Sequence, residues 1–236
     1  IFDEAAAKAV ADRCCGKTGT VEETSKRATQ LSPQLFDLTS LQREANNKFG
    51  FSAKTTLSLA QSLYEKHKVL TYPRTDSRAL PEDYPATVKE TLQHVAQMPS
   101  FSKAAEKILA GNWVKPNKRI FNNAGISDHF AIIPTLAVPA GTMSEAERKV
   151  YDLVVRRFMA VFYPVAEYDV TTRITTVGED HFKTEGKVLV NPGWLEVYGK
   201  TGTGEGNLAA LNGAKTATAE SVDVEKLETR PPARYT

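Results

Sequence analysis

The sequence has little cysteine, no long apolar run and almost no net charge. Its only two cysteines, Cys14 and Cys15, are adjacent, so the chain can form neither an ordinary disulfide framework nor a four-thiolate zinc site. We expect both side chains to be buried or half-buried. No stretch approaches the roughly 20 apolar residues that cross a bilayer, so no membrane partner is expected. A net charge of +2 does not by itself indicate a nucleic-acid binder.

Targeting and nucleotide-binding signals are missing as well. The first residues are acidic and lack the basic-then-apolar order of a signal peptide, which predicts a cytoplasmic protein. The chain begins without an initiator Met, and we expect it to be a piece of a longer protein. Two Gly-Lys-Thr triplets, at 16–18 and 199–201, lack the glycine that a phosphate loop needs five residues earlier, because those positions hold Ala11 and Trp194.

Both ends of the chain are predicted to be rich in β-strand. Residues 18–35 have no helical period and suit a strand, which a short Ala-rich helix precedes over 3–15. A hairpin turn is expected at residues 178–180. Strands are predicted around and beyond this turn, over 168–176, 181–190 and 194–197, and the polar run 215–229 extends the β section.

The middle of the chain is predicted to be helical. Thr39 and Gln42 have the spacing of a capping box, which would start a helix that ends near Gly50. Ser52 then caps a second helix, and a short strand follows at 69–72. Four residues of the second helix lie at helical spacing and are expected to face inward: Ala53, Leu57, Ala60 and Tyr64. Two helices, a turn and a strand are typical of a winged-helix-like unit, although this pattern alone is weak evidence.

Further helices complete this region and define the predicted fold class. Amphipathic stretches cover 86–97 and 101–110, and Ser144 with Glu147 forms a capping box for a long helix. The order of strands, helices and strands predicts an α+β protein. A mainly helical winged-helix-like domain would be inserted in a β-strand-rich arch domain, with residues 32–165 in the first, and 1–31 and 166–236 in the second.

Residues 71–77, Thr-Tyr-Pro-Arg-Thr-Asp-Ser, carry the pattern that points to chemistry. A phenol such as Tyr72 is a poor nucleophile at its usual pKa of about 10, and it needs nearby positive charge. Arg74 can supply that charge and can also clamp a phosphate with two hydrogen bonds. The alternative is a tyrosine packed in a strand before a polar turn. The residue types alone favour that alternative.

A second polar cluster, residues 127–135, contains His129 at the start of an apolar run. A lone histidine at such a place is more often a satisfied core residue than a catalyst. No spacing of His, Cys and acidic residues resembles a zinc site, so we expect no metal within this chain. A basic window, defined here as residues 48–78, suits a solvated face or a DNA-binding surface. Its cations are Lys48, Lys54, Lys66, Lys68, Arg74 and Arg78.

These segments, in this order, closely resemble the type IA DNA topoisomerases. The catalytic segment of that family resembles Leu41–Asn46, Phe51–Thr56 and Tyr72–Ser77, its second signature Asp128–Thr135, and a third Arg230–Thr236. The proline after Tyr72 and the two isoleucines before Pro134 favour the topoisomerase III branch. The match spans nearly the whole chain.

The resemblance implies roles for single residues. Tyr72 would attack one DNA strand and hold its 5′-phosphate as an ester, and Arg74 would steady the scissile phosphate. His129 would contact the phosphate or the DNA beside it. Five residues are weaker carry-overs that would orient the loop or contact DNA: Gln42, Lys54, Thr75, Asp76 and Ser77. In the family, the helical part acts as a hinged gate on the arch.

The resemblance also implies partners outside this chain. Family members hold magnesium with a Glu and an Asp-x-Asp run ahead of this region, and this sequence contains no Asp-x-Asp. We therefore expect magnesium to bind in the remainder of the parent topoisomerase. The chain alone should neither cleave nor relax DNA appreciably, although it should bind single-stranded DNA weakly and with marked salt dependence. A helicase partner is left open.

Two other functions remain as alternatives. A non-catalytic winged-helix DNA-binding module would use the basic window on phosphates, and Tyr72 would only stack or pack. A tyrosine recombinase-like transferase would leave a 3′-linked product. Such enzymes place a late tyrosine after several Arg and His residues, whereas Tyr72 precedes His129 here, which disfavours this alternative.

Overall fold

The computed structural model describes residues 1, 3–138, 141–200, 208, 211 and 213–231, and the chain divides into two compact units. The unit that we call the sheet unit comprises Ile1–Ala28, Tyr168–Val188 and Gly204–Thr236. The other, the helical unit, comprises Thr29–Glu167 and Leu189–Thr203. The prediction of an α+β protein is confirmed, since helices and a four-stranded sheet both form.

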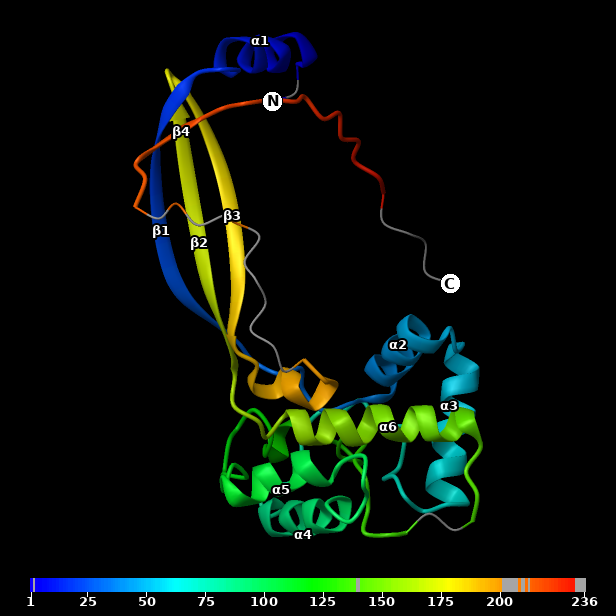
Figure 1. Cartoon of the computed structure of the whole chain (residues 1–236). Helices are drawn as coiled ribbons and strands as arrows, with labels where there is room; N and C mark the ends of the chain where they lie inside the picture. The colour runs from blue at the N-terminus through cyan, green and yellow to red at the C-terminus, as the bar shows by residue number, and fades with distance from the viewer. Residues whose placement is uncertain (2, 139–140, 201–207, 209–210, 212, 232–236) are drawn as a thin grey trace. The chain divides into compact units, whose positions relative to one another are not determined.

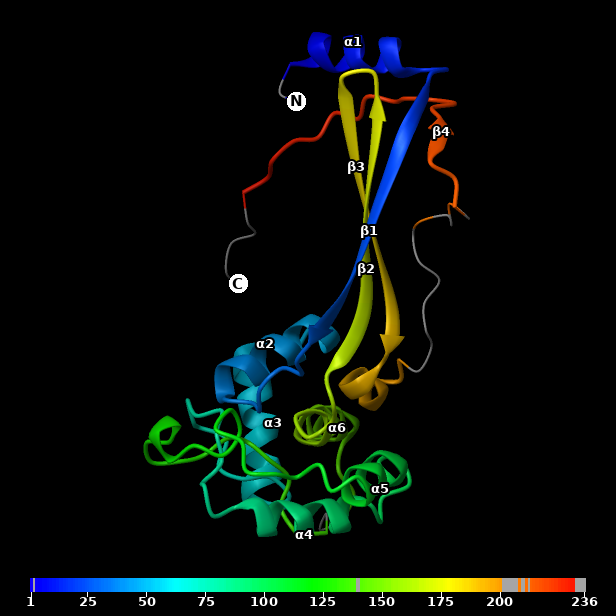
Figure 2. The ribbon, with the colours of Figure 1, turned by 90° about the vertical axis from the view of Figure 1, so that its left-hand side faces the viewer.

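The sheet unit is built on three long strands and a short fourth one (Figure 1). The strand order is β3-β2-β1-β4, and β4 pairs antiparallel with β1. At the hairpin between β2 and β3, Asp180 receives two hydrogen bonds from Arg13 of helix α1, 2.6 and 2.7 Å long. Both views show α1 at this end of the strands (Figures 1 and 2). The bounds are α1 Glu4–Cys14, β1 Thr18–Gln30, β2 Ala166–Val177, β3 Asp180–Asn191 and β4 Thr216–Thr218.

The end of the predicted β section is wrong in two places. Residues 194–197 do not form a strand but lie in the 3-10 helix η2, Gly193–Tyr198. Its apolar side chains do not alternate, and Trp194, Leu195 and Val197 are all buried in the helical unit, where η2 packs against helix α6. Within the described residues, only Thr216–Thr218 of the polar run 215–229 forms a strand. The predicted burial of the cysteines holds for Cys14, whereas Cys15 is exposed.

The helical unit packs around α6, Glu145–Ala160, which contacts α2, α3, α5 and η2. Along α6, Val150, Val154 and Phe158 are fully buried, as the helical spacing requires. Among the described residues, no helix combines the length and the apolar character needed to cross a membrane. The other bounds are α2 Leu38–Phe49, α3 Ala53–Glu65, α4 Pro85–Val95, α5 Ser102–Ala110 and the 3-10 helix η1 Asn123–Gly125.

The helix caps confirm two predictions and correct a third. Ser52 caps α3, and Ser144 forms a capping box with Glu147 at the start of α6. The capping box of α2 is made by Asp37 and Ser40 instead of Thr39 and Gln42. Asp37 lies two residues earlier and offers a carboxylate, which accepts from the Ser40 amide at 2.6 Å.

The buried stripe of α3 also differs from the predicted one. Thr56, Ala60 and Leu63 are fully buried. Ala53 is exposed, and Tyr64 is 38% exposed. The prediction that Tyr64 faces inward is therefore wrong, and its ring is available at the surface.

Two extended segments far apart in the sequence pair with each other inside the helical unit. Leu70 and Pro134 form an antiparallel bridge. The Thr71 amide donates to the Ile133 carbonyl at 3.0 Å, and the Thr135 amide donates to the Val69 carbonyl at 3.0 Å. Since the buried side chains of Val69, Leu70 and Ile133 are β-branched or leucine, apolar burial and backbone pairing act together. This pairing brings the segment of Tyr72 beside the segment of His129.

Candidate active site

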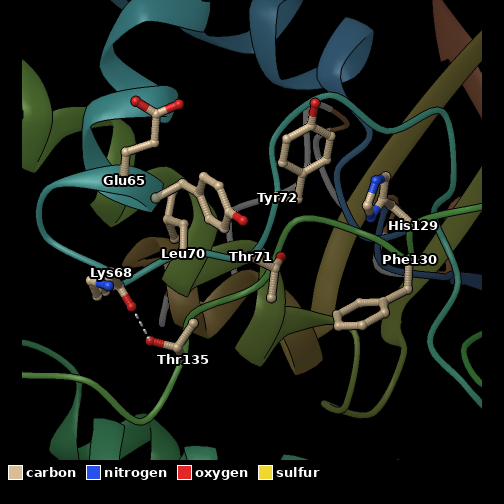
Figure 3. Close-up of a pocket in the computed structure, with 9 residues that line it drawn as sticks. Glu65, Lys68, Leu70, Thr71, Tyr72, His129, Phe130 and Thr135 are labelled. Carbon is tan, nitrogen blue, oxygen red and sulfur yellow. Dashed lines mark hydrogen bonds between the residues drawn. The ribbon is translucent and has the colours of Figure 1, made fainter.

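An open cleft of about 580 Å³ lies where the two paired segments meet the end of α3 (Figure 3). Its lining combines aromatic, cationic, acidic and hydroxyl side chains. It comprises Tyr64, Glu65, Lys68, Leu70, Thr71, Tyr72, His129, Phe130 and Thr135. A volume of this size is in the range of ligand-binding clefts, about 300–1,000 Å³.

Tyr72 is held at the cleft by the residues on both sides of it. The Thr71 hydroxyl donates to the Ala131 carbonyl at 3.0 Å and accepts from the Ile133 amide at 2.9 Å. Pro73, on the other side, is buried. These contacts hold the backbone on both sides of Tyr72. Tyr72 itself is half-buried, and its side chain lines the cleft.

Two aromatic rings flank the Tyr72 phenol. The His129 ring lies beside it, as Figure 3 shows. The ring centroids are 4.3 Å apart and the planes are tilted by 44°. The Tyr64 ring meets it edge-on, at 5.4 Å and 78°. His129 is exposed, so it is not the satisfied core histidine that the residue pattern allowed. These contacts restrict the ring of Tyr72 and leave its cleft side open.

Arg74 is exposed, and no carboxylate pairs with it among the residues that the structure describes. Its neighbour is Gln61 of α3, whose amide oxygen, when turned toward the guanidinium, accepts from Nη2 at 3.2 Å and from Nε at 3.3 Å. A guanidinium has five donors, so Arg74 retains donors for an anion. By contrast, Arg78 donates to Asp37 at 2.7 Å.

The Asp37 carboxylate stays ionised in this pair. Burial raises the pKa of Asp37, but hydrogen bonds from Ser40 and Arg78 outweigh the burial, so the pKa lies below its ordinary value. The positive charge of Arg78 is therefore matched by Asp37. Within the basic window and the described residues, Lys54, Lys66, Lys68 and Arg74 have no carboxylate partner, whereas Lys48 pairs with Glu44.

Thr75 and Ser77 join the two segments from inside. Thr75 is 8% exposed and donates to the His129 carbonyl at 2.9 Å. Ser77 is 3% exposed and donates to the Gly125 carbonyl at 2.7 Å. Asp76 is exposed and accepts from Ser127 at 3.4 Å. These contacts tie the loop that follows Tyr72 to residues 125–129.

Gln42 and Lys54 do not line the cleft. The Gln42 amide donates to the Ala53 carbonyl at the start of α3, 3.0 Å away, which ties α2 to α3. Lys54 is exposed on the first turn of α3. The third resembling segment, Arg230–Thr236, lies largely outside the described residues, since 232–236 are not described.

The whole sequence, residues 1–236, matches a family model described as DNA topoisomerase. The chain belongs to the DNA topoisomerase family. It is 40% identical to DNA topoisomerase 3 of Bacillus licheniformis, an alignment that covers 99% of this chain and 33% of that protein. It is 48% identical to DNA topoisomerase 3 of Bacillus cereus over 75% of this chain and 24% of that protein. The predicted type IA, topoisomerase III-like membership is confirmed, and the chain spans a third or less of the length of these relatives.

The fold of this topoisomerase chain has a solved counterpart. Full-length topoisomerase I from Thermotoga maritima superposes on it with a TM-score of 0.67 and 24% sequence identity. The superposition covers 100% of this chain and 38% of the Thermotoga chain. This likeness extends over both the sheet unit and the helical unit as folds.

Sequence reasoning missed Tyr64 and Glu65 as lining residues of the cleft of this topoisomerase chain. It placed Lys68 only in the basic window and Thr135 only in a resembling segment. The sequence offered one signal for Thr135, its place in a resembling segment. The pairing that brings it to the cleft is seen only in the structure. Lys68 has a left-handed backbone, with φ of 59°, and its carbonyl accepts from the Thr135 hydroxyl at 2.6 Å (Figure 3). Non-glycine residues seldom adopt this conformation, so the hydrogen bond from Thr135 holds an uncommon backbone turn at Lys68, four residues before Tyr72.

A buried polar cluster under this turn was also missed. Ser62 donates to Glu147 at 2.6 Å, and His67 Nε2 lies 3.5 Å from the same carboxylate oxygen. Hydrogen bonds from Ser62 and Ser144 lower the pKa of Glu147 from its ordinary value of 4.5 to about 2. No sequence spacing links residues of α3 with the start of α6, so only the structure brings this cluster together.

In the described part of the topoisomerase chain, the side chains that commonly bind metals do not form a cluster. No group of three His, Cys, Asp or Glu side chains gathers there. Magnesium requires several oxygen ligands in octahedral geometry. Glu65 is the acid that lines the cleft, and it lines it alone.

Proposed function

We propose that this chain supplies the strand-cleaving tyrosine of a type IA DNA topoisomerase and that Tyr72 is the nucleophile. The observation that carries the proposal is the position of Tyr72 at an open cleft, flanked by the rings of His129 and Tyr64. Arg74, two residues further along the chain, is exposed and retains donors beyond those that it gives to Gln61. Membership in the topoisomerase family supports the same conclusion.

The reaction would be a reversible exchange of esters. The Tyr72 phenolate oxygen attacks the phosphorus of one DNA strand, and a P–O bond to tyrosine forms as the P–O bond to the 3′ oxygen breaks. The 5′-phosphate stays on Tyr72, and the released 3′-hydroxyl takes the proton that the phenol gave up. Religation is the same exchange in reverse, so relaxing or decatenating DNA needs no net bond energy.

The neighbours of Tyr72 would act through charge and position. Arg74 would bind the non-bridging phosphate oxygens, because a guanidinium matches two of them at once. It would stabilise the charge that develops in the transition state. His129 would hold the phenol ring and contact the phosphate or the DNA beside it, whereas Thr75, Asp76 and Ser77 would keep the loop in place. Gln42 on α2 would support the start of α3 through its hydrogen bond to Ala53. Lys54 on α3 would contact DNA.

The remaining requirements would come from other parts of the enzyme. We infer that the magnesium expected for the family is held outside residues 1–236, by the Glu and the Asp-x-Asp run that the resemblance implies ahead of this region. The isolated chain should therefore neither cleave nor relax DNA appreciably, although it should bind single-stranded DNA. We also propose that residues 32–165 are a winged-helix-like domain inserted in the β-rich domain. The order α2, α3 and an extended segment supports this.

The test uses a chimera in which this chain replaces the matching region of the Bacillus licheniformis relative. The chimera is incubated with magnesium and single-stranded DNA labelled at either end, and it is then denatured. We expect protein attached to the 5′-phosphate side of the break, and no adduct in Tyr72→Phe. The matched control is Tyr84→Phe, which removes the hydroxyl of a half-buried tyrosine outside the cleft and should leave the adduct.

The second candidate function is a non-catalytic DNA-binding module, which the unpaired cations of the basic window favour. It predicts DNA binding that salt weakens and that Tyr72→Phe does not change. If the chimera binds DNA normally, yet forms no adduct under conditions where the intact relative does, this second function is the better account.

A further inference from the structure

The cleft extends from Tyr72 toward the end of α3, where three residues have no role in the ester exchange. Tyr64 is 38% exposed and meets Tyr72 edge-on, with an interplanar angle of 78°. In this arrangement the two rings do not stack face to face, so the exposed ring of Tyr64 can accept a further planar group. Glu65 and Lys68 line the same part of the cleft.

The polar groups of this part are uncommitted among the described residues. Neither Glu65 nor Lys68 has a salt-bridge or side-chain hydrogen-bond partner there, and both are exposed. A carboxylate accepts hydrogen bonds, as from the amino group of a base, and an ammonium binds phosphate. An aromatic ring beside an acceptor and a cation is the set of groups that binds a nucleotide.

The wall that carries these residues is rigid. The Thr135 hydroxyl fixes the Lys68 carbonyl at 2.6 Å, and the Thr135 amide pairs with Val69. Below it, Glu147 accepts from Ser62 on the last turns of α3 and lies beside the buried His67. Thr135 holds the Lys68 turn, and Glu147 holds the end of α3 through Ser62. This side of the cleft is therefore formed before a ligand binds, which lowers the entropy lost on binding.

We propose that this part of the cleft binds one unstacked nucleobase of the strand being cleaved. The base stacks on Tyr64, Glu65 accepts from its edge, and Lys68 contacts an adjacent phosphate. The inference rests on the proposed function for its substrate and adds a subsite to it. Since the cleft adjoins Tyr72, the base belongs to a nucleotide next to the scissile phosphate or one step from it.

The first experiment is an abasic scan in the chimera. A series of single-stranded oligonucleotides carries one abasic site at each position within two nucleotides of the break, and covalent adduct is measured. At one position we expect the cleavage rate to fall by about 10-fold, the order that base stacking on an aromatic side chain provides. In Tyr64→Leu, the intact oligonucleotide should already show this loss, and the abasic site at that position should add nothing further.

Two control variants separate stacking from damage to α3. Tyr64→Phe retains the ring and should retain the position-specific loss. Ser58→Ala changes an exposed residue of the same helix, and both its rate and its scan should match those of the unmodified chimera. Glu65→Gln should change the preference among bases at that one position, because an amide also donates. Abasic losses that are the same in the unmodified protein and in Tyr64→Leu at every position would overturn the proposal.

A binding measurement tests the base site even if cleavage fails. Tyr72→Phe protein is titrated with oligonucleotides that carry the fluorescent base 2-aminopurine at successive positions. We expect quenching at one register that disappears in Tyr64→Leu and persists in Tyr64→Phe. Absence of an adduct in the first experiment would count against Tyr72 as nucleophile, whereas quenching that ignores Tyr64 would count against the base site.

Discussion

Different interactions stabilise the sheet unit and the helical unit, each within itself. Strand β1 buries only Gly19 and Val21, and most side chains of β2 are half-exposed. The sheet unit therefore depends on backbone pairing and on surface ion pairs such as Arg13–Asp180. In the helical unit, apolar side chains along α6 are fully buried. Apolar burial is the main favourable term in folding, so the unit that carries the cleft also has the larger reserve of stability.

The largest expected effect comes from the core of the helical unit. Phe158→Ala leaves a cavity at a fully buried site and should cost roughly 3–5 kcal/mol of unfolding free energy. The matched change in the sheet unit is Ile174→Ala on β2, a half-buried site, which should cost about 1 kcal/mol or less. Urea denaturation measures both. Equal losses in the two variants would contradict the contrast drawn between the units.

The next effect concerns acid stability of the helical unit. Since the pKa of Glu147 is lowered to about 2 in the folded state, its contribution is present above the unfolded pKa and is lost as pH falls from about 4.5 toward 2. Glu147→Gln should lower the free energy of unfolding by about 2 kcal/mol at pH 7. The free energy of unfolding of this variant should also fall less steeply between about pH 4.5 and pH 2. The exposed Glu145→Gln on the same turn should change the loss of stability in this pH window much less, because its lowered pKa comes from a solvent-exposed pair with Lys149.

Tryptophan fluorescence reports this effect selectively. Both tryptophans of the sequence, Trp113 and Trp194, belong to the helical unit. Unfolding midpoints followed by fluorescence from pH 7 to pH 2 should separate the Glu147 variant from the unmodified protein. If the two curves stay parallel down to pH 2, the Glu147 hydrogen bonds do not stabilise the folded state.

A smaller effect is expected at the hairpin of the sheet unit. Arg13→Gln removes both hydrogen bonds to Asp180. High salt should weaken the same pair, because the Arg13 side chain is exposed. Hydrogen exchange of amides in α1 and in the turn should become a few times faster, with no change in α6. Faster exchange in both units would show that the loss of this ion pair also destabilises residues that do not contact it.

The smallest effect tests which unit binds DNA. Lys54→Gln on α3 should reduce the dependence of log K on log salt for single-stranded DNA by about 0.7, the value for one phosphate contact. Lys26→Gln, an equally exposed change on β1, should leave the dependence unchanged. Fluorescence anisotropy over a salt series measures both. An effect of Lys26 alone would move the DNA contact to the sheet unit.

Sequence patterns predicted elements well where the cause is local. The Ser52 cap and the capping box of Ser144 and Glu147 depend on residues three positions apart, and both form. The α2 cap was misplaced because Asp37 competes with Thr39 over two residues of chain. The predicted strand at residues 194–197 is instead the 3-10 helix η2, because a short apolar run does not reveal whether it packs on one face or on two.

The candidate site was predictable only in part for a similar reason. The residues of the Tyr72 segment stood out by their chemistry, and the resemblance added His129. Helical periodicity placed Tyr64 inward, but adjacent Leu63 occupies that face, and packing against α6 decides between them. The hydrogen bond from Thr135 to Lys68 joins residues far apart in sequence, and no spacing rule predicts such contacts.

The pairing of Val69–Thr71 with Ile133–Thr135 has a consequence for synthesis of the protein. Contacts between distant residues form late, because the loop between them must close first. A ribosome adds about 5–20 residues per second, so the second segment is made about 3–12 s after the first. During that interval Tyr72 has neither Ile133 nor His129 beside it. We therefore expect a nascent or truncated chain to carry Tyr72, the proposed nucleophile, without the residues that flank it in the folded unit. Any strand cleavage by the parent enzyme would then wait until the helical unit has folded.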